Sequence, residues 1–219
     1  MKEINEYIDH TILKPEATRA DIKKLCDEAM YYNFATVCIN SHYVPLAREI
    51  LFDSDVNICT VVGFPLGAMA TEAKVFEAGY CLNNGANEID MVANIGAIKE
   101  GNWKLYADDI YSVAKITYEH DALLKVIIET CLLTNAEIFE ACRIAVEAGA
   151  DFVKTSTGFS SGGAKVEHIK LMKEAVHGEA LVKASGGIRD LKTANEMIEA
   201  GADRLGISAS VGIMHETGK

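Results

Sequence analysis

A short turn that recurs along the chain is the feature that most constrains its fold. The segment EAGADFV (147–153) is nearly repeated as EAGADRL (199–205), and NNGANEI (83–89) is a looser copy. In each copy a helix would end in a glycine cap, and a strand would follow after a small residue and an Asp or Asn. Such short helix-to-strand connections are typical of βα units, so we expect strands and helices to alternate.

Eight strands can be placed in this way, with segments of helical periodicity between them. They are 7–11, 35–39, 58–63, 88–92, 124–129, 152–156, 181–185 and 204–207. The clearest helix is 134–149, where Thr134 and Glu137 form a capping box. Eight units without a linker predict one (β/α)₈ barrel domain over residues 1–219, near the lower size limit of about 200 residues for that fold. An open, doubly wound α/β sheet is the alternative.

Composition narrows the classes of function. The formal net charge of −11 argues against nucleic-acid binding through a general basic surface. The apolar runs are too short to cross a membrane, and the charged segment 1–12 lacks a signal-peptide pattern, so we expect a cytoplasmic protein. The six cysteines form no C-x-x-C pair and the six histidines are scattered, which predicts reduced thiols and no metal site.

Lysines stand in two of the apolar strands. Strand alternation places Lys154 and Lys183 inside the barrel, on adjacent strands about 4.8 Å apart. Asp90 points inward from a third strand, and Lys125 and Glu129 share one face of a fourth. The simplest alternative is an ion-pair network that only fills the interior.

Two crowded ammonium groups favour another interpretation. At 4 Å and an effective dielectric constant of 20 they repel by about 4 kcal/mol. That is roughly three pKa units, enough to bring a lysine from about 10.4 towards 7. An uncharged lysine attacks carbonyl groups, so the pair predicts Schiff-base catalysis, with Asp90 shuttling protons. Periodicity does not decide which lysine attacks.

Glycine-rich loops would follow strands six to eight at the same rim. SGGIR (185–189) holds Gly186, Gly187 and Arg189, GISAS (206–210) follows the last strand, and STGFSSGGA (156–164) follows the sixth. Barrels often bind phosphate with such loops. We therefore predict a phosphorylated small-molecule ligand, while nucleotide binding is unsupported because no phosphate-loop or dinucleotide motif occurs at a strand–helix junction.

Several longer motifs resemble those of the deoxyribose-phosphate aldolase family. They are DFVKTSTGF (151–159), LVKASGGIR (181–189), EIDMVANIG (88–96), KVIIET (125–130) and VVGFPLG (61–67), within a match from IDHTIL (8–13) to RLGISAS (204–210). The resemblance implies a class I aldolase that reversibly cleaves 2-deoxy-D-ribose 5-phosphate to acetaldehyde and D-glyceraldehyde 3-phosphate in deoxyribonucleotide breakdown. It implies no cofactor, and an assembly of two or four copies.

The resemblance also implies roles for individual residues. Lys154 would be the Schiff-base lysine, Lys183 the lysine that lowers its pKa, and Asp90 the proton-transfer acid. Other positions would bind substrate: Asp9, Cys38, Lys125, Thr155, Gly158, Gly186, Gly187, Arg189, Gly206 and Ser208.

The sequence departs from some relatives in three places that concern the site. Phe159 stands where some carry lysine, Ala209 where some carry a second phosphate-binding serine, and the chain ends MHETGK without their C-terminal tyrosine. Two other functions stay open: another phosphosugar barrel enzyme, transaldolase-like or an isomerase, and a non-catalytic phosphate-binding barrel.

Overall fold

Strands and helices alternate along the chain, and the strands pair in sequence order until the last meets the first. The computed structural model describes residues 2–218. The strands are β1 (Ile8–Ile12), β2 (Thr36–Ile39), β3 (Asn57–Val62), β4 (Glu88–Val92), β5 (Leu123–Ile127), β6 (Phe152–Lys154), β7 (Leu181–Ser185) and β8 (Arg204–Ile207). All neighbouring pairs are parallel, and β8 pairs with β1. The predicted (β/α)₈ barrel is confirmed, and the open sheet is wrong because no strand edge is left unpaired among the described residues.

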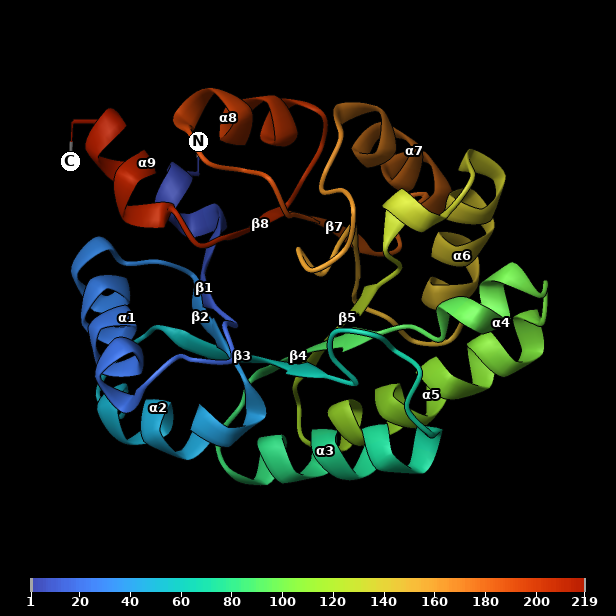
Figure 1. The fold of residues 1–219 in the computed structure, drawn as a ribbon, viewed down its shortest axis with the longest axis horizontal. Helices are drawn as coiled ribbons and strands as arrows, with labels where there is room; N and C mark the ends of the chain where they lie inside the picture. The colour runs from blue at the N-terminus through green and yellow to red at the C-terminus, as the bar shows by residue number, and fades with distance from the viewer. Residues whose placement is uncertain (1, 219) are drawn as a thin grey trace.

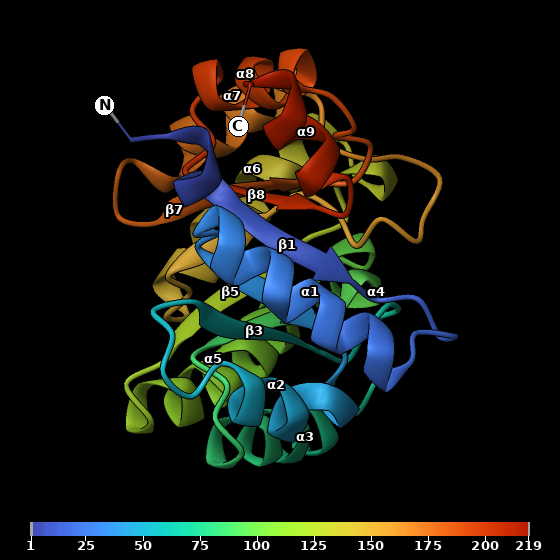
Figure 2. The same cartoon turned by 90° about the vertical axis from the view of Figure 1, so that its left-hand side faces the viewer.

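Helices surround the barrel (Figure 1). They are α1 (Arg19–Tyr32), α2 (Val44–Ile50), α3 (Thr71–Asn83), α4 (Ile95–Lys99), α5 (Trp103–Glu119), α6 (Asn135–Glu147), α7 (Val166–Val176), α8 (Leu191–Glu199) and α9 (Ser210–Glu216). Short 3₁₀ turns lie at η1 (Ile4–Tyr7), η2 (Ser41–Tyr43) and η3 (Thr130–Leu132). In the side view of Figure 2, α1 lies against the outside of the barrel next to β1.

The recurring turn behaves as its sequence predicts. Gly149 and Gly201 follow α6 and α8 with φ of 98° and 111°, in the left-handed region that favours glycine. At Gly201 the space is also limited, because a Cβ would lie 2.8 Å from the Lys173 side chain. The backbone therefore reverses at the same point of both units and enters the next strand.

Strand ends account for most differences from the predicted boundaries. β4, β7 and β8 have the predicted limits, whereas β5 ends at Ile127 because Glu129 adopts a left-handed conformation with φ of 55°. β6 ends at Lys154, although the amide of the next residue, Thr155, still donates to the Lys183 carbonyl at 3.1 Å. These shifts leave the alternation of side chains unchanged.

Because side chains alternate along each strand, they form two layers, one facing the helices and one facing the interior of the barrel. The outward residues of β4, β6 and β7, such as Met91, Val153 and Val182, are fully buried in the main apolar core between strands and helices. The inward residues include the charged side chains Glu88, Asp90, Lys154 and Lys183, together with a small apolar cluster that contains Cys38, Cys59 and Val61. The main core thus lies between strands and helices, and the interior of the barrel holds the charged groups.

Two expectations from composition concern the whole chain. All six cysteines are free thiols, and five of them are buried, as expected. Within residues 2–218 no helix combines the length and the apolar character needed to cross a bilayer. The cytoplasmic location stays a prediction.

Candidate active site

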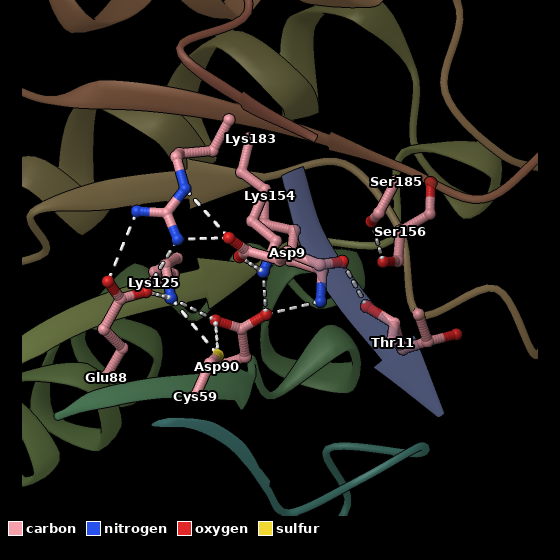
Figure 3. A network of polar contacts seen from close by, with 12 residues as sticks. Asp9, Thr11, Cys59, Glu88, Asp90, Lys125, Lys154, Ser156, Lys183 and Ser185 are labelled. Carbon is pink, nitrogen blue, oxygen red and sulfur yellow. Dashed lines mark hydrogen bonds and ion pairs between the residues drawn. The ribbon is translucent and has the colours of Figure 1, made fainter. Parts of the chain in front are cut away.

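Lys154 and Lys183 meet inside the barrel. They are register partners on β6 and β7 and both are buried, at 3% and 0% exposure. Their Nζ atoms lie 2.6 and 2.7 Å from the same oxygen, Oδ2 of Asp90 on β4 (Figure 3). The structure therefore brings together the three residues for which the sequence predicts catalytic roles.

A third lysine occupies the other side of Asp90. Lys125 of β5 donates to Asp90 Oδ1 at 2.8 Å and pairs with Glu88 at 2.5 Å. The Cys59 thiol also donates to Asp90 Oδ1, at 3.1 Å. Asp90 is thus held from both sides, and its carboxylate has little freedom to rotate.

Asp9 and Arg204 complete the charged cluster. Asp9 of β1 contacts the Lys183 ammonium and accepts a bond of 2.8 Å from Nε of Arg204, which also lies 3.3 Å from Glu88. The cluster holds four cations, Lys125, Lys154, Lys183 and Arg204, against the three carboxylates Asp9, Glu88 and Asp90. One positive charge is in excess within this cluster.

These carboxylates change the predicted electrostatics. Burial alone would lower the pKa of Lys183, but Asp9 and Asp90 outweigh it and raise that pKa above its usual value. Burial would likewise raise the pKa of Asp90, but the three lysine charges lower it well below its usual value. The sequence prediction treats the two lysines as a pair without a carboxylate, whereas in the structure both donate to Oδ2 of Asp90. The role of Lys183 as the lysine that activates Lys154 stays a prediction.

The lysines also differ in their partners. Lys125 contacts Glu88 and Asp90, and Lys183 contacts Asp9 and Asp90. In the described part of the chain, Lys154 contacts one carboxylate only, and it shares that oxygen with Lys183. Lys154 is the least compensated of the three lysines, and it alone lines the pocket above.

That pocket is a cavity of about 570 Å³ at the carboxyl ends of the strands. It is the place where barrels bind their ligands. Six predicted phosphate or sugar contacts line it with Lys154: Gly158, Gly186, Gly187, Arg189, Gly206 and Ser208. Loops after β6, β7 and β8 thus converge on one opening.

At this rim the backbone conformation and the close packing of the loops explain why glycine is present. Gly186 has φ of 83°, and a Cβ there would lie 3.0 Å from Cα of Gly163 in the neighbouring loop. The Ala164 amide donates to the Gly186 carbonyl at 3.0 Å. The loops after β6 and β7 are therefore packed backbone to backbone at Gly163 and Gly186.

Four predicted substrate contacts do not line the pocket. Asp9, Cys38 and Lys125 are fully buried in the barrel interior. Thr155 is turned towards β7, where its hydroxyl donates to the Ser185 carbonyl at 3.1 Å and accepts from the Ser185 amide at 3.0 Å. The predicted substrate contact of Thr155 is not supported, because alternation along β6 puts it on the opposite face from Lys154.

Sequence reasoning missed part of the site. Arg204 and Cys59 belong to the charged cluster, and Thr157 lines the pocket, yet none of them was predicted as a site residue. The signal for Arg204 was alternation on β8, where it shares the inward face with Gly206. No local pattern marked Cys59, whose role depends on Asp90 and Lys125 arriving beside it.

Two sets of side chains have the donor types of a metal site. They are Cys38, Cys59 and Asp90, and Asp9, Cys59 and Glu88, each with ligand atoms within 4.8 Å of one another. The Lys125 ammonium lies 3.3 Å from the Cys59 sulfur and 2.8 Å from Asp90. Donor atoms of both sets are therefore already in contact with a cation of the chain itself, the Lys125 ammonium group.

Comparison with known proteins agrees with this geometry. Residues 4–214 match the DeoC/LacD family of aldolases. The chain is 57% identical to the deoxyribose-phosphate aldolase of Finegoldia magna over 97% of its own length and 99% of the relative's, and 56% identical to that of Clostridium tetani over 98% and 99%. A solved tetrameric deoxyribose phosphate aldolase from Aeropyrum pernix is 30% identical, with a TM-score of 0.92 over 99% of this chain and 91% of that one. The chain belongs to the DeoC/LacD family of aldolases.

Proposed function

We propose that the chain is a class I aldolase that reversibly cleaves 2-deoxy-D-ribose 5-phosphate to acetaldehyde and D-glyceraldehyde 3-phosphate, in deoxyribonucleotide breakdown. The observation that carries this proposal is a buried lysine cluster directly beneath a glycine-rimmed pocket. Lys154 contributes both to the cluster and to the pocket lining. The relatives named deoxyribose-phosphate aldolase support the choice of substrate.

Lys154 acts as the nucleophile. Its uncharged amine attacks the C1 aldehyde of the open-chain sugar, and loss of water leaves a protonated imine. When the C2–C3 bond breaks, its electron pair moves into this imine and forms an enamine, while the C3 hydroxyl loses its proton and becomes the aldehyde of the released product. Protonation of the enamine at C2 and hydrolysis then release acetaldehyde and return the amine. The sequence of steps uses neither metal nor organic cofactor.

Asp90 and Lys183 support these steps. Asp90 Oδ2, 2.6 Å from Lys154 Nζ, can accept and return the protons of carbinolamine formation and breakdown. The charged Lys183 ammonium shares that oxygen and so competes with Lys154 for it. Its positive charge favours the uncharged, nucleophilic form of the neighbouring amine.

The rim loops hold the phosphate. Backbone amides of the loops after β7 and β8 and the exposed guanidinium of Arg189 suit an anion that enters from solvent. With the phosphate at this rim and C1 at Lys154, the sugar would lie along the pocket. Gly158 and Ser208 would contact its middle part or its phosphate.

We also propose that the chain works as one barrel domain and as a homo-oligomer. The closed ring of strands supports a single domain over the described residues. The tetrameric relative supports assembly, and so does a group of exposed aromatic side chains on α3 and α5.

Borohydride trapping tests the proposed chemistry. Acetaldehyde and borohydride should add a two-carbon group to Lys154, which peptide mass spectrometry would locate. Lys154→Ala should lose both this label and all turnover, whereas replacement of the surface residue Lys192, 87% exposed in its side chain, should change neither. Labelling of another lysine would identify that lysine as the nucleophile in place of Lys154. Turnover of a ketose phosphate, with no turnover of deoxyribose 5-phosphate, would show that the proposed substrate is wrong.

A further inference from the structure

Glu129 has an unusual backbone for a glutamate. It follows β5 with φ of 55° and ψ of 64°, a left-handed conformation that few residues other than glycine adopt. The amides on both sides of it donate to the end of β6 and to the residue after it, from Ile128 to the Lys154 carbonyl at 3.0 Å and from Thr130 to the Thr155 carbonyl at 2.8 Å. The strain is therefore located beside the backbone of the Schiff-base lysine.

The side chain of Glu129 is equally unusual. It is 2% exposed, and within residues 2–218 no lysine, arginine or histidine forms an ion pair with it. Its Oε2 accepts instead from the amide and the hydroxyl of Thr157, at 3.2 and 2.5 Å, and Oε1 lies 3.7 Å from the Cys131 sulfur. A buried carboxylate without a cation is costly, so its retention points to a specific task.

That task concerns the loop after β6. The Thr157 hydroxyl, which donates to Glu129, accepts from the Phe159 amide at 3.0 Å. The Phe159 ring meets Phe64 of the loop after β3 edge to face, with centroids 5.2 Å apart. Residues 157–159 all line the pocket beside Lys154. One carboxylate thus fixes the turn that brings an aromatic wall to the opening.

We propose that Glu129 is a positioning residue for the reaction: through Thr157 it holds loop 157–159 in place beside Lys154. This inference rests on the proposed function, because it is the aldol chemistry at Lys154 that needs a fixed wall. The carboxylate touches no reacting atom in this role. Its work is to accept two bonds from Thr157, and an amide oxygen can do the same.

The test compares Glu129→Ala, Glu129→Gln and Thr157→Val in the full-length chain. We expect Glu129→Ala to lower kcat/KM by about 100-fold, mostly in kcat, and Glu129→Gln by less than about threefold. Thr157→Val should lower kcat/KM as well. In the double variant with Glu129→Ala, the loss of kcat/KM should be about tenfold smaller than the product of the two single losses, because both changes remove the same contact. A control, Asn5→Ala, removes two side-chain bonds to Tyr32 and Asn33 at the other end of the barrel and should leave both kinetic constants unchanged.

Two results would overturn the inference directly. Equal loss in Glu129→Gln and Glu129→Ala would mean that the charge itself is required, and equal loss in Asn5→Ala would mean general destabilisation. If Glu129→Ala does not fold, the two other variants decide. Near-full activity of Glu129→Gln together with reduced activity of Thr157→Val would support the role of Glu129. Unreduced activity of Thr157→Val would reject it. Failure to trap Lys154 in the unaltered chain would reject the proposed function, whereas trapping and turnover unchanged in Glu129→Ala would reject only the role of Glu129.

Discussion

At the scale of single residues, the interior of the barrel distributes three carboxylates unevenly among four cations. Lys125 and Lys183 each contact two carboxylates, and Lys154 contacts Asp90 alone within the described chain. Since Asp9 and Asp90 overcome the effect of burial and raise the pKa of Lys183, that lysine stays charged throughout the pH range in which the enzyme would be assayed. A permanent charge beside Lys154 would support the nucleophilic role that we propose for this lysine.

Replacement of Lys183 by methionine tests this arrangement. The substitution removes the neighbouring charge and leaves Asp90 Oδ2 to Lys154, and both changes favour the charged form of the Lys154 amine. The uncharged nucleophile should then form only at higher pH, so the acidic limb of the kcat profile should move up by about one pH unit or more. The matched control is Lys173→Met, which breaks a half-buried pair with Asp203 and should leave the profile in place. An unmoved limb in Lys183→Met would rule out the electrostatic role.

At the scale of elements, the three loops after β6, β7 and β8 form the rim of the pocket, where we propose that phosphate binds. The loops after β6 and β7 approach within backbone distance at Gly163 and Gly186. A Cβ at Gly206 would lie 2.9 Å from the Ser185 Cβ and 3.3 Å from Lys183 Cε. The rim and the charged cluster are therefore closely packed at Gly206, where no side chain larger than that of glycine fits.

Arg189 gives a way to test the rim without moving the cluster, because its side chain is exposed at the pocket edge. Hydrogen bonds to charged groups contribute about 1.5–3 kcal/mol, and exposure reduces this, so Arg189→Ala should raise KM for deoxyribose 5-phosphate by about tenfold. Cleavage of unphosphorylated 2-deoxyribose serves as the internal control and should keep its KM. An equal rise for both sugars would place the phosphate elsewhere.

At the scale of the whole molecule, a strongly acidic chain encloses a site rich in basic side chains. The net charge of −11 belongs to the whole sequence, and the interior cluster sets four basic side chains against three carboxylates. Large apolar side chains also stand exposed on two neighbouring helices, Phe76 and Tyr80 on α3 and Tyr111 and Tyr118 on α5. Such a group of exposed aromatic residues is typical of an interface.

The assembly prediction can be tested at Phe76, which is 78% exposed. Sedimentation velocity of the unaltered chain should give a species larger than the monomer, and Phe76→Glu should shift it to the monomer, because a buried unpaired carboxylate would oppose association. The control is Phe52→Glu, which replaces another exposed ring, 69% exposed and outside α3 and α5. A monomeric unaltered chain would contradict the oligomer, and an unchanged Phe76→Glu assembly would place the interface elsewhere.

Much of the site could be predicted because a strand has a fixed side-chain period. That period alone places Lys154, Lys183 and Asp90 in the interior, and the register of β6 and β7 sets the two lysines side by side. The same rule would have found Arg204, and it would have placed Thr155 on the opposite face from Lys154. The period also placed Glu129 on one strand face with Lys125, but β5 ends at Ile127 and Glu129 is left-handed, so its contacts could not be predicted. Thr157 lies in a loop, where no period applies.

The sequence by itself determined the alternation of strands and helices, the face on which each strand residue lies, and the identity of the interior charges, because all of these follow from local periodicity and turn chemistry. Only the tertiary structure decided which charges touch. Asp9 and Arg204 are separated by 195 residues and become partners solely because β8 closes on β1. The ionic state of Lys183 depends on such contacts, and Coulomb energy is a function of distance in space rather than along the chain.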